Sequence, residues 1–303
     1  MATASDRIRR ARPLLGTFVE IEVAGAANAE MDAAVNAAFE AVACVHRLMS
    51  FHEADSDVSR INRDAGLQPT RVHNWTFEVL KAAAEMHRRS NGVFDITVAP
   101  ILQALGLLPR SAGDPPNSSR ARLLDAIELL PGQIVRLRRP DIKIDLGGIA
   151  KGFAVDRALE ALRHFNVPVG MVNAGGDLAA FGPEPQTVYI RDPRDPRRLI
   201  CSVEVADEAL ASTARCFDLF QSAETTVSAI IDPGTGRPAP AIDGATVRAP
   251  SCMVADALTK IVMISGTDVT ELLGHCNASA LLISADGDIQ ITPDWHHAVH
   301  LAA

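Results

Sequence analysis

The sequence predicts an α+β fold, and three observations lead to it. Segments with strand-like alternation and segments with helical periodicity follow one another without the strict alternation of a parallel α/β sheet. Hydrophobic residues make up 48% and charged residues 22% of the 303 residues, which is typical of a globular protein with a substantial core. No internal repeat is visible, so the sequence does not indicate a repeat architecture.

The first part of the chain is predicted to hold one strand and two helices. The strand alternates apolar and polar side chains, and both helices carry apolar residues at helical spacing. Asn91 and Gly92 form a stop signal for the second helix. In order, the predicted elements are strand 17–23, helix 28–49, polar turn 51–63, helix 76–89 and loop 112–119.

The centre of the chain is a glycine turn at residues 145–152, Asp-Leu-Gly-Gly-Ile-Ala-Lys-Gly. It lies between a predicted strand at 142–144 and a predicted helix at 153–162. Glycines let the backbone approach a phosphate, helix N–H groups face it, and Lys151 adds positive charge. The spacing is neither a Walker A motif nor a dinucleotide fingerprint. Taken alone, the stretch fits an anion site or a plain tight turn.

The second half is predicted to be rich in strands. A buried strand runs into the turn at 173–178, and another ends at the turn beginning with Asp232. A closing hairpin is expected around Asp286 and Gly287. In order, the predicted elements are strands 167–172, 188–190, 199–205 and 227–231, helix 254–265, and hairpin strands 278–284 and 288–292.

Charge and cysteine usage exclude several classes of protein. The net charge of −8 disfavours a nucleic-acid partner, and the arginines within residues 7–12 are expected to form a solvated arm. The five cysteines are scattered without a CxxC pair, which favours reduced thiols over disulfides or a zinc site. No apolar run is long enough for a membrane span, and no signal peptide is visible. A cytoplasmic protein is therefore expected.

Four turns rich in glycine and aspartate suggest loops that converge on a ligand. They are residues 92–95, 145–152, 173–177 and 232–236. Asp256 stands near the start of the last predicted helix. There it either interacts with the helix dipole or supplies a hard oxygen ligand for Mg²⁺ held against a diphosphate.

These blocks together resemble the FAD:protein FMN transferase family, also called the ApbE family. They occur in the family's order and cover nearly the whole chain. The matching blocks are 14–17, 49–50 with Ser56 and Asn62, 92–97, 145–152, 173–178, 230–233 with 235–238, and 255–258.

The resemblance implies an enzyme that binds FAD and, with Mg²⁺, moves FMN onto a threonine of a flavin-accepting protein, releasing AMP. It also implies an α+β fold with a smaller α/β lobe packed on a T-fold-related core and FAD between them. Residues 1–303 are then one unit of two intimately packed lobes, whose boundary is not visible in the sequence.

The resemblance assigns site residues as well. Asp256 and the backbone carbonyl of Gly148 are expected to hold Mg²⁺, and Lys260 stands at the position of a further metal ligand. The turn at 173–177 is expected to shape the cleft rather than perform chemistry. The expected FAD contacts are Leu15, His52, Val93, Phe94, Asp95, Asp145, Lys151 and Ile230.

The chain departs from the family pattern at four places. Ala229 replaces the histidine that is the candidate base for the acceptor threonine, and Lys260 replaces a usual threonine. Residues 212–214 read Ser-Thr-Ala instead of Thr-Ser-Gly, and Leu15 replaces a methionine. Loss of a general base commonly costs about 10²- to 10⁴-fold in rate. A non-transferring FAD-binding protein and an FAD hydrolase are therefore alternatives to the transferase.

Lys260 has two interpretations. Residues i and i+4 share a helix face, so its ammonium can approach Asp256 and replace the metal partly or wholly. Alternatively, Thr259 supplies the oxygen ligand and Lys260 points outward.

Overall fold

The protein has the α+β fold that the sequence predicts. The computed structural model describes residues 7–25, 28–110, 126–195, 197–214, 228–239 and 242–301. The larger lobe is built on an eight-stranded sheet whose neighbouring strands all pair antiparallel. In spatial order its strands are β1 (Arg7–Leu14), β2 (Thr17–Ala24), β6 (Gly170–Ala174), β7 (Asp177–Phe181), β10 (Glu208–Ala214), β13 (Ile242–Ala249), β14 (Ser279–Ser284) and β15 (Ile289–Ile291).

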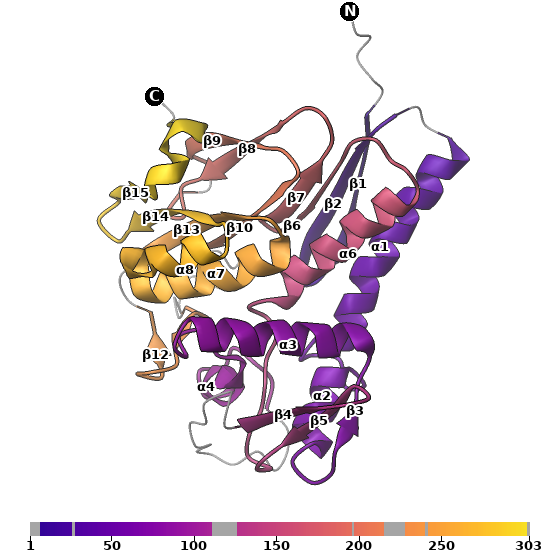
Figure 1. Ribbon diagram of the computed structural model, residues 1–303, viewed down its shortest axis with the longest axis vertical. Helices are drawn as coiled ribbons and strands as arrows, with labels where there is room; N and C mark the ends of the chain where they lie inside the picture. Colours follow the sequence, from indigo (N-terminus) through magenta and orange to yellow (C-terminus); the bar gives the residue numbers. More distant parts are fainter. Residues whose placement is uncertain are drawn as a thin grey trace, which may run out of the picture.

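Both faces of this sheet are covered, which explains why every residue of β7 is buried. Three helices pack on one face: α1 (Ala29–Met49), α6 (Ala150–His164) and α7 (Cys252–Ser265) (Figure 1). The other face carries a three-stranded sheet of β8 (Gln186–Arg191), β9 (Leu199–Val205) and β16 (Val299–Leu301), with the short helix η3 (Pro293–Ala298). Along β7, Ala179 and Phe181 join the core on the helix side, and Leu178 and Ala180 join the core around Trp295.

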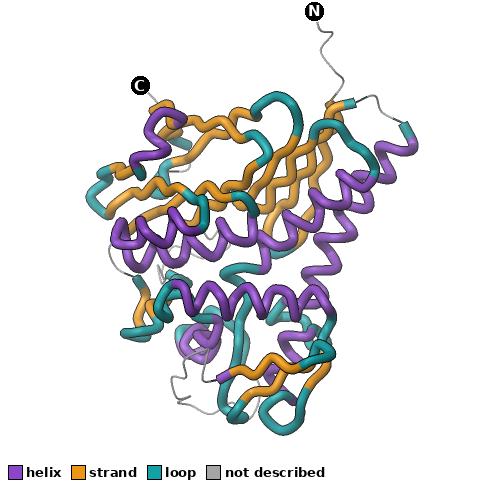
Figure 2. Tube along the Cα trace, in the orientation of Figure 1, coloured by secondary structure: helices purple, strands orange, loops and turns teal. Residues whose placement is uncertain are grey.

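The smaller lobe holds a three-stranded sheet and its helices. The helix α3 (Asn74–Arg89) runs between this small sheet and the helices of the larger lobe (Figures 1 and 2). Buried residues of the smaller lobe, such as Val58 and Leu137, belong to the same hydrophobic cluster as the helix side of the large sheet. The remaining elements of this lobe are α2 (Asp57–Asp64), β3 (Thr70–Arg71), η1 (Ile96–Val98), α4 (Ala99–Ala104), β4 (Ile127–Leu130) and β5 (Ile134–Leu137).

The predicted long helices and the closing hairpin are confirmed. The helices α1, α3 and α7 each begin where a side chain accepts a backbone N–H of the first turn, with Asn28, His73 and Ser251 as the caps, whereas α6 begins without a side-chain cap. The hairpin is β14 and β15. The chain also contains η2 (Gly266–Val269) and α8 (Thr270–His275), which the sequence did not predict.

Two predictions in the first half are wrong. The turn predicted at 51–63 is largely the helix α2, because Ser56 caps it and Val58 and Ile61 reach the core despite the polar sequence. Residues 142–144 do not form a strand. The side-chain amide of Asn62 bonds both backbone groups of Ile144, at 2.7 Å and 2.9 Å, in place of a neighbouring strand.

Three further predictions are wrong in part. The arginines within residues 7–12 lie on the edge strand β1 rather than on a solvated arm, and Arg7 and Arg9 pair with Glu22 and Glu20 of β2. The strand predicted at 167–172 is shifted to β6. Of the strand predicted at 227–231, only Ile231 is paired, in β11 (Ile231–Asp232) with β12 (Arg237–Pro238). Val227 and the predicted loop 112–119 lie outside the described residues.

The described residues can be compared with two predictions, one about a membrane span and one about the state of the cysteines. None of their helices combines the length and the apolar character needed to cross a membrane. The four described cysteines, Cys44, Cys201, Cys252 and Cys276, are free thiols, and Cys216 lies outside the described residues.

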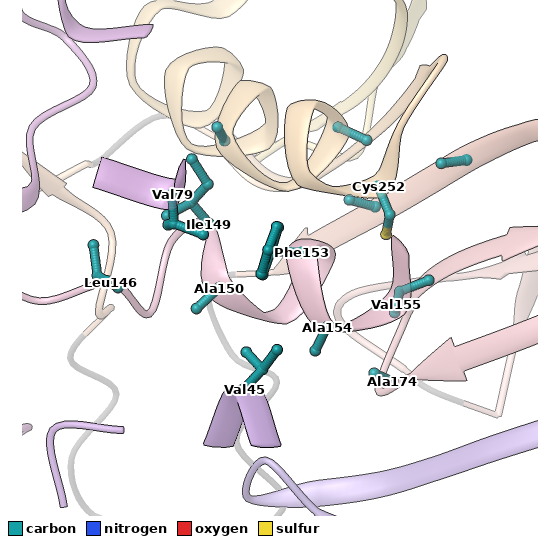
Figure 3. Packing of buried hydrophobic residues seen from close by; sticks show 14 of the residues in the cluster. Val45, Val79, Leu146, Ile149, Ala150, Phe153, Ala154, Val155, Ala174 and Cys252 are labelled. Atoms are coloured by element: carbon teal, nitrogen blue, oxygen red, sulfur yellow. The ribbon is translucent and has the colours of Figure 1, made fainter. Parts of the chain in front are cut away.

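The helices α6 and α7 cross closely at Gly152. A Cβ atom placed there would lie 2.2 Å from the carbonyl oxygen of Cys252 and 2.8 Å from the Cβ of Asp256. Asp156, one turn further along α6, accepts the N–H groups of Cys252 and Met253 at 2.8 Å and 2.9 Å, which satisfies the start of α7. Figure 3 shows Phe153 of α6 in the core around this crossing, with Val45 of α1 close by.

We predict opposite effects from two glycine-to-alanine changes within helices. Alanine is the better helix former by about 1 kcal/mol. Gly152→Ala nevertheless forces α6 and α7 apart, and we expect it to lower the free energy of unfolding by at least about 2 kcal/mol. At Gly274 of α8 an added Cβ meets no atom within 4 Å. Gly274→Ala is therefore the matched control, expected to be neutral or stabilising in urea denaturation. Equal effects of the two changes would contradict the close crossing.

Candidate functional site

Three of the four glycine turns come together at the start of α6. The backbone N–H of Asp145 bonds the carbonyl of Ile96 at 2.8 Å, which joins the central turn to the turn at 92–97. The ring of Phe94 and the stem of Lys260 both lie within van der Waals distance of a Cβ placed on Gly148. Lys151, in the first turn of α6, contacts Asp177 of the third turn.

The fourth turn closes on itself. The carboxylate of Asp232 accepts the N–H of Gly234 and the hydroxyl of Thr235, both at 2.8 Å. Just before it, Ala229 is exposed and Ile230 packs partly against the main core. The N–H of Ile230 donates to Ser228, and its carbonyl accepts the N–H of Ala239.

A buried carboxylate, Asp256, lies where α6 and α7 meet. It is fully shielded from solvent. Its Oδ2 accepts the N–H of Gly152 at 3.0 Å, and its Oδ1 pairs with the ammonium of Lys260 one turn along α7. The same ammonium lies 3.1 Å from the hydroxyl oxygens of Thr213 and Thr259. Asp256 is therefore bonded at both oxygens, and Lys260 is held by acceptors from two elements.

A second buried ion pair lies beside the first. Asp177 has no solvent exposure, and its Oδ2 pairs with Lys151. Its Oδ1 has no hydrogen-bond partner among the described residues. Asp177 thus fixes the ammonium of Lys151, a role that the sequence analysis missed because it treated 173–177 only as part of the cleft wall. The signal was its position directly after two glycines at a strand start.

The two ion pairs influence each other. Burial alone would raise the pKa of Asp256, but Lys260 and Lys151 hold it below its usual value. Burial raises the pKa of Asp177, and the negative charge of Asp256 adds to this effect. Burial would lower the pKa of Lys151, but Asp177 and Asp256 raise it above its usual value. The four groups form one buried cluster with two positive and two negative partners.

The turn at 92–97 is fixed by local bonds. The Nδ1 of His87 lies 2.8 Å from the carbonyl oxygen of Phe94. The Oδ1 of Asp95 accepts the N–H and the hydroxyl of Thr97, at 2.8 Å and 2.7 Å. Val93 packs partly against the main core. These bonds place the Phe94 ring against Gly148.

The remaining expected FAD contacts lie near the same turn or on the β1–β2 hairpin. Asp145 accepts the N–H of Gly147 at 3.0 Å. Burial raises the pKa of Asp145, and the Gly147 N–H and His52 act in the opposite direction. His52 is exposed just after α1. Leu15 occupies the turn between β1 and β2 with a positive φ of 56°.

Asp256 does not fit a divalent cation in this arrangement. Mg²⁺ requires close octahedral coordination by oxygen ligands. Both oxygens of Asp256 already accept hydrogen bonds, one of them from the Lys260 ammonium. The described residues also contain no group of three or more His, Cys, Asp or Glu side chains placed to hold a metal.

The structure decides how Lys260 is oriented. Its side chain is only 14% exposed and points at Asp256, so the interpretation in which Lys260 points outward is wrong. Thr259 also faces this centre, with its hydroxyl 2.8 Å from that of Thr213. Thr213 belongs to the segment 212–214, whose departure from the family pattern was its only signal in the sequence.

We predict that Lys151→Met is strongly destabilising, because it leaves Asp177 buried without a counter-ion. Loss of one partner of a buried pair costs about 3 to 5 kcal/mol. The matched control is Arg197→Met, since Arg197 pairs with Asp195 but is 90% exposed. Exposed pairs contribute about 0 to 1 kcal/mol. The free energies of unfolding in urea, measured without FAD, test this difference. If Lys151→Met lowered the free energy of unfolding as little as Arg197→Met does, the buried pair would not be needed for stability.

The comparisons with known proteins agree on one family. The sequence model described as the ApbE family matches residues 15–283. The FAD:protein FMN transferase of Vibrio cholerae is 29% identical over 256 residues, covering 80% of this chain and 77% of that protein. The enzyme of the same name from Haemophilus influenzae is 28% identical over 242 residues, covering 74% of this chain and 70% of that protein.

Solved structures show the same fold. The crystal structure of the ApbE protein from Thermotoga maritima has a TM-score of 0.86 and 25% identity, with 97% of this chain and 99% of that chain covered. The flavin transferase ApbE from Vibrio cholerae has a TM-score of 0.82 at 24% identity and covers the same shares. The family match extends over residues 15–283, and the fold match covers 97% of the chain. The chain therefore belongs to the ApbE family.

Proposed function

We propose that this chain is a flavin transferase that binds FAD and moves its FMN part to a threonine of an acceptor protein, releasing AMP. The curated relatives named FAD:protein FMN transferase support this activity. The observation that carries the proposal is the convergence on the start of α6. There the Phe94 ring and the stem of Lys260 lie against Gly148 of the glycine turn, and Lys151 in the first turn of α6 is fixed by Asp177.

This arrangement suits attack on a phosphoanhydride. In the proposed step, the threonine oxygen bonds to the FMN phosphorus, the bond from that phosphorus to the bridging oxygen breaks so that AMP leaves with this oxygen, and the hydroxyl proton passes to solvent. The reaction requires positioning and compensation of negative charge more than covalent chemistry by the protein. The dipole of α6 supplies positive potential at the diphosphate, and the two lysines neutralise the buried carboxylates of Asp177 and Asp256 beside it.

The finer assignments belong to this proposal. The resemblance supports FAD contacts by the eight expected residues, with Asp145 and Lys151 near the flavin. It also implies Mg²⁺ at Asp256 and Gly148, although the donor set around Asp256 does not fit the ion. A cytoplasmic location stays a prediction.

The exposed Ala229 favours a second candidate function. The family histidine expected to accept the hydroxyl proton is missing there, so FAD binding without transfer is the alternative. Hydrolysis of FAD, with water in place of the threonine, is a further alternative. The three functions differ in whether AMP is released and whether an acceptor becomes flavinylated.

We predict acceptor-dependent release of AMP from FAD by the native protein. The measurement uses an acceptor domain with its target threonine, and the control is the same domain with that threonine changed to valine. Stoichiometric AMP and covalent flavin with the threonine domain alone support transfer. AMP release with both domains indicates hydrolysis. FAD binding without AMP in any mixture would contradict the enzymatic proposal.

We also predict that Ala229→His accelerates the transfer by at least about tenfold, since a positioned base contributes about 10² to 10⁴ in rate. The added rate is expected to rise with pH through about 6.5, where an ordinary imidazole loses its proton. Ala229→Gln is the matched control, because it adds a polar side chain of similar size that cannot act as the base. Equal rates for the two variants would show that a histidine at this position does not accept the proton.

A further inference from the structure

We infer that Lys260 is a built-in cation that makes FAD binding independent of Mg²⁺ and keeps divalent ions away from Asp256. This inference rests on the proposed FAD site and goes beyond it, since it concerns which cation serves that site. Its basis is the position of the Lys260 side chain between Asp256, Thr213, Thr259 and Gly148.

The ammonium of Lys260 has three polar partners. It pairs with Oδ1 of Asp256 and lies 3.1 Å from each of the hydroxyl oxygens of Thr213 and Thr259. Three partners match the three N–H donors of an ammonium. Because these partners come from α7 and β10, the cation is fixed from two sides before any ligand arrives.

The stem of Lys260 fills the space next to Gly148. Its Cγ and Cε lie 3.6 Å and 3.7 Å from a Cβ placed on that glycine. The side chain therefore bridges Asp256 of α7 and the glycine turn before α6. An ion bound to both would have to displace the ammonium and its stem together.

The charge balance within the buried cluster also supports the role of Lys260 in place of a divalent ion. The ionised cluster contains two carboxylates, Asp177 and Asp256, and two ammonium groups, Lys151 and Lys260. Its formal charge is therefore zero. A divalent ion added beside Lys260 would be repelled by its ammonium and would find no net negative charge to offset the loss of its hydration shell. Removal of the Lys260 charge would leave a net negative centre that attracts a cation.

The ammonium of Lys260 also changes the charge that the diphosphate of FAD meets. An uncompensated Asp256 carboxylate would repel the diphosphate of FAD at the start of α6. Lys260 cancels that charge through its pairing with Asp256, and its side chain is 14% exposed. The diphosphate of FAD can therefore bind at the N-terminus of α6 without a metal ion between them.

The test begins with the native protein, so that it does not depend on any variant folding. FAD binding is followed by flavin fluorescence in EDTA and in millimolar MgCl₂. We expect the two Kd values to agree within about threefold, a small difference in binding free energy. A native Kd that improves about tenfold or more with Mg²⁺ overturns the inference while leaving the proposed function standing. No FAD binding in either buffer overturns the proposed function, and this inference with it.

Variants of Lys260 then separate charge from oxygen ligation. Lys260→Thr removes the cation and supplies a hydroxyl, so its affinity for FAD is expected to fall about tenfold or more in EDTA and to recover with Mg²⁺. Lys260→Met supplies neither group and is expected to bind FAD weakly in both buffers. Lys81→Thr is the matched control on α3, where Lys81 is exposed, and should behave like the native chain. Recovery of Lys260→Met in Mg²⁺ to the native affinity would contradict the assigned role of the ammonium.

A direct metal measurement completes the test without reference to catalysis. Mn²⁺ serves as the probe for a hard divalent site, and electron paramagnetic resonance reports the free ion. We expect the native protein and Lys81→Thr to leave Mn²⁺ free, and Lys260→Thr to bind one equivalent in the presence of FAD. Stoichiometric Mn²⁺ binding by the native protein under the same conditions would overturn the inference.

Discussion

The arrangement of the site depends on one buried carboxylate, that of Asp256. Its two oxygens connect different parts of the chain, since one accepts the N–H of Gly152 in α6 and the other pairs with Lys260 in α7. A buried carboxylate is tolerated only when it is paired and hydrogen-bonded. The sequence meets this requirement with a lysine one turn later in the helix and a glycine where the two helices touch. The glycine turn before α6 is positioned as a result.

The close helix crossing and the charged cluster depend on each other. Without a side chain at Gly152, its backbone N–H can reach Asp256, and the same approach shields the carboxylate of Asp256 from water. Exclusion of water strengthens the attraction between the charges and increases the cost of removing any one of them. The second carboxylate, Asp177, extends the cluster to β7 and holds Lys151 beside the start of α6. The packing of the two helices and the pairing of the charges therefore fix the positions of the same side chains.

The sequence pattern predicted the elements whose formation depends on residues close together in the chain. The long helices have apolar periodicity, and α1, α3 and α7 also have side-chain caps, so their positions followed from the sequence. The polar helix α2 and the segment at 142–144 did not, because each depends on partners distant in the chain, such as the Asn62 amide that bonds Ile144. At the site, the i to i+4 spacing allowed Lys260 to reach Asp256 but left an outward-pointing Lys260 equally open, and the structure selects the first. The contacts of Asp177 and Thr213 depend on strand pairing across the large sheet and could not be predicted from spacing alone.

The hydrophobic core that passes from the large sheet into the smaller lobe has a consequence for motion. Lobes that share one continuous core cannot swing apart as rigid bodies without exposing apolar surface, unlike domains joined by a small polar interface. Hinge opening is therefore an expensive way to admit a ligand into this protein. Entry and exit at the proposed site would depend on rearrangement of surface turns and side chains, so exchange rates would be set by local fluctuations rather than by movement of whole lobes.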